Sequence, residues 1–178
     1  MKSLLLTGTL FVLVAVLQAQ DDLPFLSEDK NVSGIWYMKA TVNDLNSTEW
    51  KSPKEEFPFV VRALEKGNME VMTVSMYNGE CLQVDVLLEK TKKPGQYSAF
   101  WGTYLMYIYE LPVMDHYIFY SECQFFEQKV YVGELIGKDP KENYEALEDF
   151  KKFAQQKGFP LENIIVPEQR AALQNCKP

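Results

Sequence analysis

Few side chains in this sequence are of the types that carry out catalysis. The 178 residues include one histidine, His116, and three cysteines, Cys81, Cys123 and Cys176. A thiol or hydroxyl nucleophile needs a general base beside it, and His116 lies at the end of a predicted hairpin with no evident nucleophile. The sequence contains no Gly-x-Ser-x-Gly motif, no pair of metal ligands at a typical spacing and no phosphate-binding loop. We therefore expect no enzymatic activity, no metal ion and no cofactor.

The charge of the chain argues against nucleic acid as a partner. Acidic residues number 25 and basic residues 18, which gives a formal net charge of −7 at pH 7, and the basic residues form no cluster. Proteins that bind nucleic acid present a basic patch to the phosphate backbone. No nucleic acid partner is therefore expected.

The first 19 residues have the features of a secretory signal peptide. Lys2 supplies the positive end, an apolar run extends from Leu4 to Leu17, and Ala19 is a small residue suited to the cleavage position. The apolar run is too short to span a bilayer, and charges interrupt every later one. We expect residues 1–19 to be removed and residues 20–178 to form one secreted domain that does not insert into a membrane.

Secretion changes what the cysteines and two asparagines imply. In an oxidising compartment, three cysteines allow one internal disulfide and leave one thiol over. Asn31 and Asn46 each begin an Asn-x-Ser/Thr sequence, the acceptor pattern for N-glycosylation. Both asparagines are therefore candidate glycosylation sites.

From about residue 34 the chain is a succession of short apolar or alternating segments separated by turn residues, which is typical of an antiparallel sheet. Most links have hairpin length, so sequential strands should be neighbours. The longer polar stretch at 43–56 is predicted to be a lid loop. Eight strands are predicted, approximately at residues 34–42, 57–64, 69–77, 81–89, 96–101, 104–111, 116–123 and 129–136.

One helix is predicted after the strands. Asp139-Pro140-Lys141-Glu142 offers an N-cap, a proline at the first helical position and an acid for a capping box. An apolar stripe then follows at helical spacing, and residues 163–166 are predicted to form an additional edge strand. The residues of the stripe are Tyr144, Leu147, Phe150 and Ala154.

The expected fold class is all-β. Eight antiparallel strands could also make a two-sheet sandwich, but links of hairpin length favour an eight-stranded antiparallel up-and-down β-barrel. The single C-terminal α-helix should pack outside the barrel. A barrel of eight strands can hold one small ligand.

Alternation along each strand predicts which side chains face the barrel interior. In the last strand either Glu134 or Leu135 points inward, and an inward Glu134 would anchor a ligand or have a pKa raised by desolvation. In the third strand Val71 and Thr73 are assigned to solvent, and the inward faces of 104–109 and 116–123 stay open. The candidate ligand-binding residues are Met38, Ala40, Val42, Met72, Val74, Met76, Leu82, Val84, Val86, Leu88 and Glu134.

A set of short runs resembles the lipocalin family over essentially the whole chain that follows the leader. The runs are Gly34-Ile35-Trp36 at the first strand, Asp115-His116-Tyr117 at a late hairpin and Gly137-Lys138 before the helix. Within the family, the sequence is similar to the group of vomeronasal secretory, tear (von Ebner's gland) and odorant-binding lipocalins. This resemblance implies a secreted carrier that binds small lipophilic molecules such as pheromones or odorants and transports them in nasal, vomeronasal or glandular mucus.

The resemblance also implies roles for particular residues. A disulfide should join Cys81 to Cys176, which would leave Cys123 free. Lys138 stands where the family pattern has an arginine, and it should contact the Trp36 ring at the closed end of the barrel. The expected structural motif consists of Gly34, Trp36, Asp115, Tyr117 and Lys138.

Two other function classes compete with the carrier function. One branch of the family is an isomerase that uses a barrel thiol, but here two cysteines are expected to pair and no base accompanies the third. A protein-interaction role, such as protease inhibition of the tear-lipocalin type, could coexist with transport. A receptor or mucosal protein would then be a further partner.

Overall fold

The computed structural model describes residues 23–45, 55–77, 80–125 and 127–170. The predicted signal peptide, Asn46, Cys176 and most of the predicted lid loop lie outside these residues. So do the side chains of Met76 and Cys81, although their backbone positions in the strands are described.

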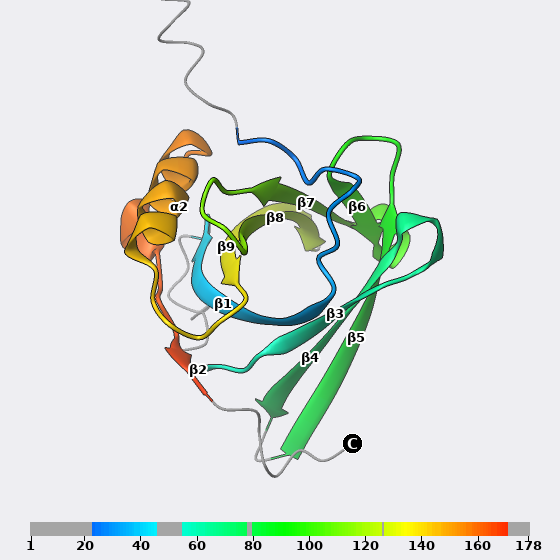
Figure 1. The fold of residues 1–178 in the computed structure, drawn as a ribbon, viewed down its shortest axis with the longest axis horizontal. Helices are drawn as coiled ribbons and strands as arrows, with labels where there is room; N and C mark the ends of the chain where they lie inside the picture. The colour runs from blue at the N-terminus through cyan, green and yellow to red at the C-terminus, as the bar shows by residue number, and fades with distance from the viewer. Residues whose placement is uncertain (1–22, 46–54, 78–79, 126, 171–178) are drawn as a thin grey trace, which may run out of the picture.

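The strands close into a barrel in which each is antiparallel to its neighbours (Figure 1). The expected eight-stranded up-and-down β-barrel is therefore confirmed. Its strands are β1 (Gly34–Asn43), β3 (Phe59–Ala63), β4 (Met69–Tyr77), β5 (Glu80–Lys90), β6 (Gln96–Ala99), β7 (Tyr104–Glu110), β8 (His116–Phe125) and β9 (Gln128–Gly137).

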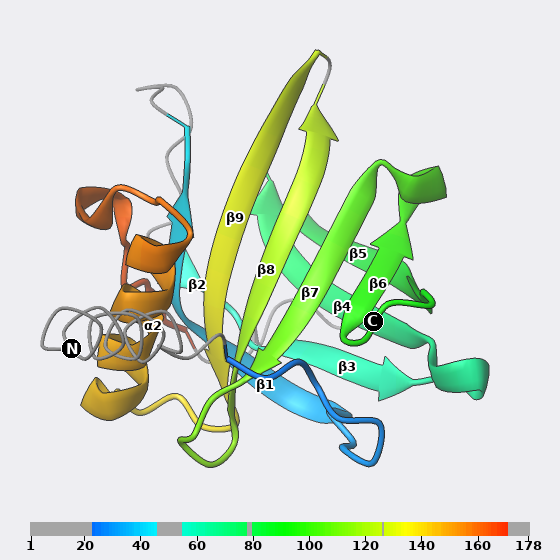
Figure 2. The same cartoon turned by 90° about the horizontal axis from the view of Figure 1, so that it is seen from above.

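The two ends of the barrel differ. The hairpin that joins β7 to β8 and the N-terminal segment lie at one end, and the far ends of β8 and β9 lie at the other (Figure 2). The N-terminal segment is tied to β7 by hydrogen bonds from Leu26 N to Ile108 O, 2.9 Å, and from Glu110 N to Pro24 O, 2.8 Å. We call the end beneath this segment the closed end, and the opposite end the open end.

The helix α2 (Tyr144–Gln156) packs on the outside of the barrel, as expected. Its N-cap is Asn143, whose side-chain oxygen accepts a hydrogen bond from Ala146 N at 3.0 Å, so the prediction of a helix beginning after Asp139 is wrong. The Asp139 side chain instead accepts a hydrogen bond from Lys141 N in a preceding turn. Gly158, with φ +81°, follows the helix end.

The buried stripe of α2 consists of Ala146, Phe150, Phe153 and Ala154, with Leu147 partly buried against the same cluster. Tyr144, predicted in the stripe, is 74% exposed because it occupies the first helical turn, beyond the contact with the barrel.

The segment that follows the helix returns to β1. Ile165 forms an isolated antiparallel bridge with Thr41, which supports the predicted edge pairing of residues 163–166. The strand itself lies slightly later, where β10 (Glu168–Gln169) pairs in parallel with β2 (Glu55–Glu56). Among the described residues, the helices are too short or too polar to cross a membrane.

Two apolar clusters hold these elements together. One lies inside the barrel and includes Trp36, Met69, Leu88 and Phe119. The other lies between the outer barrel face and α2 and includes Phe150. A strand residue in the first cluster therefore points into the barrel, and a strand residue in the second cluster points outward.

Candidate functional site

The closed end of the barrel is filled by Trp36, which is 1% exposed. The indole Nε1 donates a hydrogen bond to Val32 O at 2.6 Å, and the Tyr117 ring packs edge-on at 5.3 Å between centroids. Lys138 Nζ lies 3.8 Å from the Trp36 ring centroid and donates to Ser33 O at 2.7 Å. The predicted contact between Lys138 and Trp36 is confirmed.

Two structural features require a glycine at position 34, two residues before Trp36. Gly34 has φ +117°, a conformation that side chains other than glycine rarely adopt. A Cβ atom at this position would also lie 2.9 Å from Lys138 Nζ. Asp115 completes the motif from the β7–β8 hairpin, where its backbone oxygen accepts a hydrogen bond from Lys138 N at 3.2 Å.

The open end is different, because inward-facing apolar side chains there reach solvent. Alternate residues of a strand share one face, so Leu82 and Val84 face the same way as Val86 and Leu88, which pack in the interior cluster. Leu82 is nevertheless 49% exposed and Val84 37% exposed. The interior is therefore accessible to solvent from the open end, and the four inward assignments on β5 are confirmed.

The prediction for β4 has the wrong face. Residues directly opposite in an antiparallel pair lie on the same face. Val71 lies opposite Val86 and Thr73 opposite Val84, so these two point inward.

Three predicted ligand-binding residues are thereby corrected to the outer face. Met72 and Val74 lie opposite Asp85 and Gln83, and the backbone of Met76 occupies the same outward register. Apolar residues occur on both faces of β4, so hydrophobicity could not choose between them. The pairing with β5 determines which face of β4 points inward. The solvent-accessible interior tolerates the hydroxyl of Thr73.

The prediction for β1 is right at Met38 and wrong beyond it. The register shifts between Met38, which lies opposite Ile136 of the interior cluster, and Ala40, which lies opposite Leu135 of the outer cluster. This β-bulge adds one residue and reverses the alternation. Ala40 and Val42 consequently pack in the outer cluster beneath α2 and not in the interior.

The extra residue of the bulge is Lys39, which is buried outside the barrel. Its ammonium group donates hydrogen bonds to the backbone oxygens of Asp139 and Lys141. Desolvation lowers the pKa of Lys39, and the nearby Asp139 carboxylate opposes that shift. The lysine therefore ties β1 to the turn before α2 and brings no charge into the interior.

The structure resolves the choice in β9 in favour of Glu134. Leu135 belongs to the outer cluster, whereas Glu134 points inward between Thr41 and Phe119, its partners on the two neighbouring strands. Protein atoms surround the carboxyl group although it keeps partial solvent access, and this desolvation, with the charge of Glu56 second, raises its pKa to about 7. Among the described residues, nothing donates a hydrogen bond to it or forms an ion pair with it.

A second carboxyl group close to Glu134 was missed because it belongs to the last residue of the predicted lid. Glu56 belongs to the short strand β2, and burial raises its pKa to about 7. No alternation exists in a two-residue strand, so no pattern in the sequence could have found it.

The interior also holds a hydroxyl pair that the sequence left undecided. Tyr104 Oη lies 2.7 Å from Ser121 Oγ, and Tyr104 packs against the interior cluster. Desolvation and the Glu134 charge raise the pKa of Tyr104. The inward position of Tyr117, a motif residue four places before Ser121, was the signal that could have assigned this face.

Cys123 lies opposite Tyr104 on the same inward face. It has no disulfide partner among the described residues, and desolvation together with Glu134 raises the pKa of its thiol. A raised pKa disfavours the reactive thiolate. His116 faces outward, with Nδ1 2.8 Å from Met114 O, so it does not serve as a base for this thiol.

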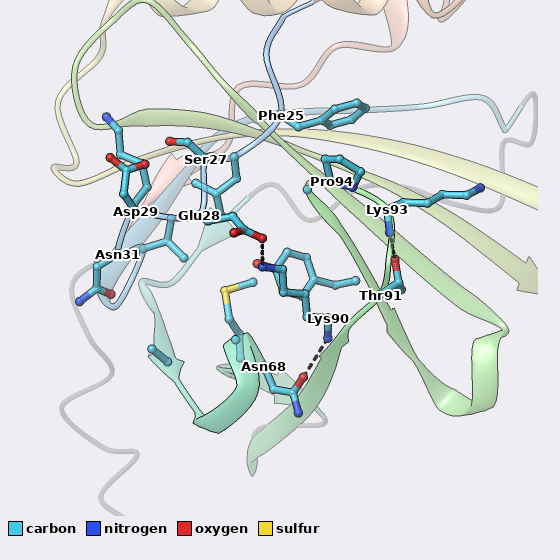
Figure 3. A pocket seen from close by; sticks show the side chains of 18 of the residues that line it. Phe25, Ser27, Glu28, Asp29, Asn31, Asn68, Lys90, Thr91, Lys93 and Pro94 are labelled. Carbon is cyan, nitrogen blue, oxygen red and sulfur yellow. Dashed lines mark hydrogen bonds and ion pairs between the residues drawn. The ribbon is translucent and has the colours of Figure 1, made fainter.

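A separate cavity of about 560 Å³ lies at the closed end, between the N-terminal segment and two hairpins (Figure 3). An ion pair between Lys90 Nζ and Glu28 Oε1, 2.8 Å, crosses it, and Lys90 N donates to Asn68 Oδ1 at 2.9 Å. None of the predicted ligand-binding residues lines this cavity. We assign the candidate site to the barrel interior, where the exposed apolar side chains and the unpaired Glu134 lie.

Comparison with known proteins agrees with this geometry. The model of the lipocalin / cytosolic fatty-acid binding protein family matches residues 33–171. Vomeronasal secretory protein 2 of Mus musculus is 51% identical over 170 residues, which cover 96% of this chain and 91% of that protein. Odorant-binding protein 2a of Mus musculus is 41% identical, with 94% of this chain and 95% of that protein covered.

A solved structure of the siderocalin Ex-FABP shares the fold. It superposes with a TM-score of 0.66 at 14% sequence identity and covers 79% of this chain and 95% of its own. The names of the two sequence relatives describe a secretory and a binding protein, and neither names a reaction. This chain belongs to the lipocalin / cytosolic fatty-acid binding protein family, whose members include carriers of small hydrophobic ligands.

Proposed function

We propose that this protein is a secreted carrier that binds a volatile lipophilic chemosignal, such as an odorant or a pheromone, inside its barrel. The observation that carries the proposal is the exposure of Leu82 and Val84, which face the interior and yet reach solvent. Apolar surface held open to water in this way gains free energy when a guest covers it, about 25 cal/mol for each Å² removed from water.

The proposed binding residues follow from the observed register. Met38, Val86 and Leu88 retain their predicted place, and Thr73 joins them. Trp36 and Lys138 close the other end. A ligand therefore enters at the open end.

The chemical class of the guest rests on similarity. The relatives named for odorant binding and for vomeronasal secretion support an odorant or a pheromone as the guest. Transport in nasal, vomeronasal or glandular mucus is the setting that we propose for this activity.

Secretion, glycosylation and the disulfide belong to the same proposal. Cleavage after Ala19 would release residues 20–178. Asn31 is exposed, which suits a glycan, and Asn46 is the second proposed acceptor. The proposed disulfide joins Cys81 to Cys176 in this secreted form.

The test is extraction of the secreted protein, followed by mass spectrometry of bound small molecules and titration with the fluorescent probe N-phenyl-1-naphthylamine. Val86→Trp fills the interior and should abolish probe binding. Leu87→Trp, its neighbour on the exposed outer face, is the matched control and should bind as wild type does. Equal binding by both variants would overturn the interior as the site.

A further inference from the structure

The interior of the barrel carries acidic groups. Among the described residues, the ionisable carboxyl groups there are those of Glu134 and Glu56, which are close enough for the Glu56 charge to raise the pKa of Glu134. Two basic side chains at the closed end already have partners, because Lys90 pairs with Glu28 and Lys138 bonds to Ser33 O. Among the described residues, no cation forms an ion pair with Glu134 or Glu56.

Glu134 stands where a guest would lie. It shares the inward face of β9 with Ile136 of the interior cluster, and Tyr104 and Cys123 are near enough to feel its charge. The described residues leave its carboxyl group without a hydrogen-bond donor or a cation. A buried carboxylate in that condition is costly, and a partner that brings a positive charge relieves the cost.

The electrostatics thus discriminate between guests with the same apolar chain. A guest that ends in a carboxylate would place a like charge beside Glu134 and Glu56, which is repulsive. A guest that ends in an ammonium group would donate charge-assisted hydrogen bonds to Glu134. A neutral alcohol should fall between these two cases.

We propose that the barrel interior selects lipophilic amines, whose ammonium group pairs with the Glu134 carboxylate, over fatty acids of the same chain length. This inference rests on the proposed carrier function and names the ligand class of the same site.

Selection of an amine makes binding depend on pH. The titratable groups that face Glu134 are Glu56 from β2, Tyr104 from β7 and Cys123 from β8, while its partners Thr41 and Phe119 carry no charge. The pKa values of Tyr104 and Cys123 are raised, so both groups stay neutral near pH 7. Only the two carboxyl groups gain protons as the pH falls below about 7, and their protonation removes the attraction for an ammonium group.

The experiment compares decylamine, decanol and decanoic acid as competitors of N-phenyl-1-naphthylamine on the full secreted protein. At about pH 8 we expect decylamine to bind at least about tenfold more tightly than decanoic acid. Glu134→Gln should weaken decylamine binding about tenfold and leave decanol within about twofold of wild type. Glu122→Gln, on the outward face of β8, is the matched control and should change neither.

A pH series on the wild type needs no variant. Between about pH 8 and about pH 5.5 decylamine should lose about tenfold in affinity, while decanol stays nearly constant. The loss should be much smaller in Glu134→Gln.

The outcomes separate the two proposals. If the probe and decanol bind but decylamine does not exceed decanoic acid, the amine selectivity is overturned and the carrier function stands. If Glu134→Gln weakens decanol as much as decylamine, Glu134 is not the ammonium partner. If none of the competitors and not even the probe binds, the carrier function itself fails.

Discussion

At the scale of single residues, Glu134 and Lys138 lie four positions apart and have opposite surroundings. Lys138 is satisfied, because its ammonium group contacts the Trp36 ring and bonds to Ser33 O. Glu134 is unsatisfied among the described residues, and desolvation raises its pKa. Lys138 therefore stabilises the fold, whereas the ionised Glu134 carboxylate destabilises it.

The cost of Glu134 predicts how stability varies with pH. Its pKa is about 7 in the folded protein against 4.5 for the ordinary value. Below pH 4.5 both states hold the proton and the group has no effect. As the pH rises from 4.5 to 7, the unfolded state loses its proton first, so the folded state loses stability, and above 7 the whole cost is present.

Glu134→Gln should consequently raise the free energy of unfolding at pH 8 by about 1–3 kcal/mol. The gain should shrink to near zero at about pH 4.5. Urea unfolding at the two pH values measures both quantities, with Glu122→Gln as control. A variant that is less stable than wild type at pH 8 would contradict the assigned desolvation.

The closed end makes a second prediction about one residue. Lys138→Ala removes the contact with Trp36 and the hydrogen bond to Ser33 O, and should cost about 1–3 kcal/mol of stability. Lys138→Arg restores a planar cation over the ring and should keep or exceed wild-type stability. Thermal unfolding measures the difference. Probe affinity should not change in either variant, and a change would place this end within the binding site.

At the scale of elements, the faces of two strands depend on pairing that the sequence does not display. The bulge at Lys39 turns Ala40 and Val42 outward, and the register with β5 turns Thr73 inward and Met72 outward. In both strands the alternation of faces was predicted correctly. In β4 the inward and outward faces were exchanged, and in β1 the bulge exchanged them partway along the strand. The presence of a strand could be predicted from its periodicity, whereas the face that points inward depends on the pairing with the neighbouring strand.

The β4 register yields a test with two adjacent positions. Thr73→Trp places a large ring in the interior and should lower probe affinity at least about tenfold, because it takes the volume that a guest would occupy. Met72→Trp points outward and should leave the affinity within about twofold of wild type. Fluorescence titration of the two variants measures this. The reverse pattern would restore the face predicted from the sequence.

At the scale of the whole molecule, other segments cover the closed end of the barrel and one part of its outer face. Phe25 bridges to Tyr109, and the N-terminal segment covers the closed end. The helix α2 covers the outer face of β1 and β9. Exposed inward side chains occur towards the open end, where Cys123 also faces the interior.

The thiols report on this arrangement. With the proposed disulfide between Cys81 and Cys176, a maleimide should modify one thiol per chain in denaturant without reductant, and all three cysteines after reduction. In the native protein, decanol should slow the modification of Cys123 at least about threefold, because a bound guest covers the thiol. Mass spectrometry counts the adducts. Modification of all three cysteines without reductant would contradict the disulfide.

The sequence by itself determined the barrel, the outer helix and the closed-end motif, because turn residues, period-two alternation and the Gly34, Trp36 and Lys138 signature act over short stretches or are carried by residue identity. Only the tertiary structure decided that Glu134 and Tyr104 face the interior, that Glu56 lies close to Glu134, and that Ala40, Val42 and Met72 face outward. A side chain's face depends on strand register and on a single bulge, and both are settled by contacts between distant segments.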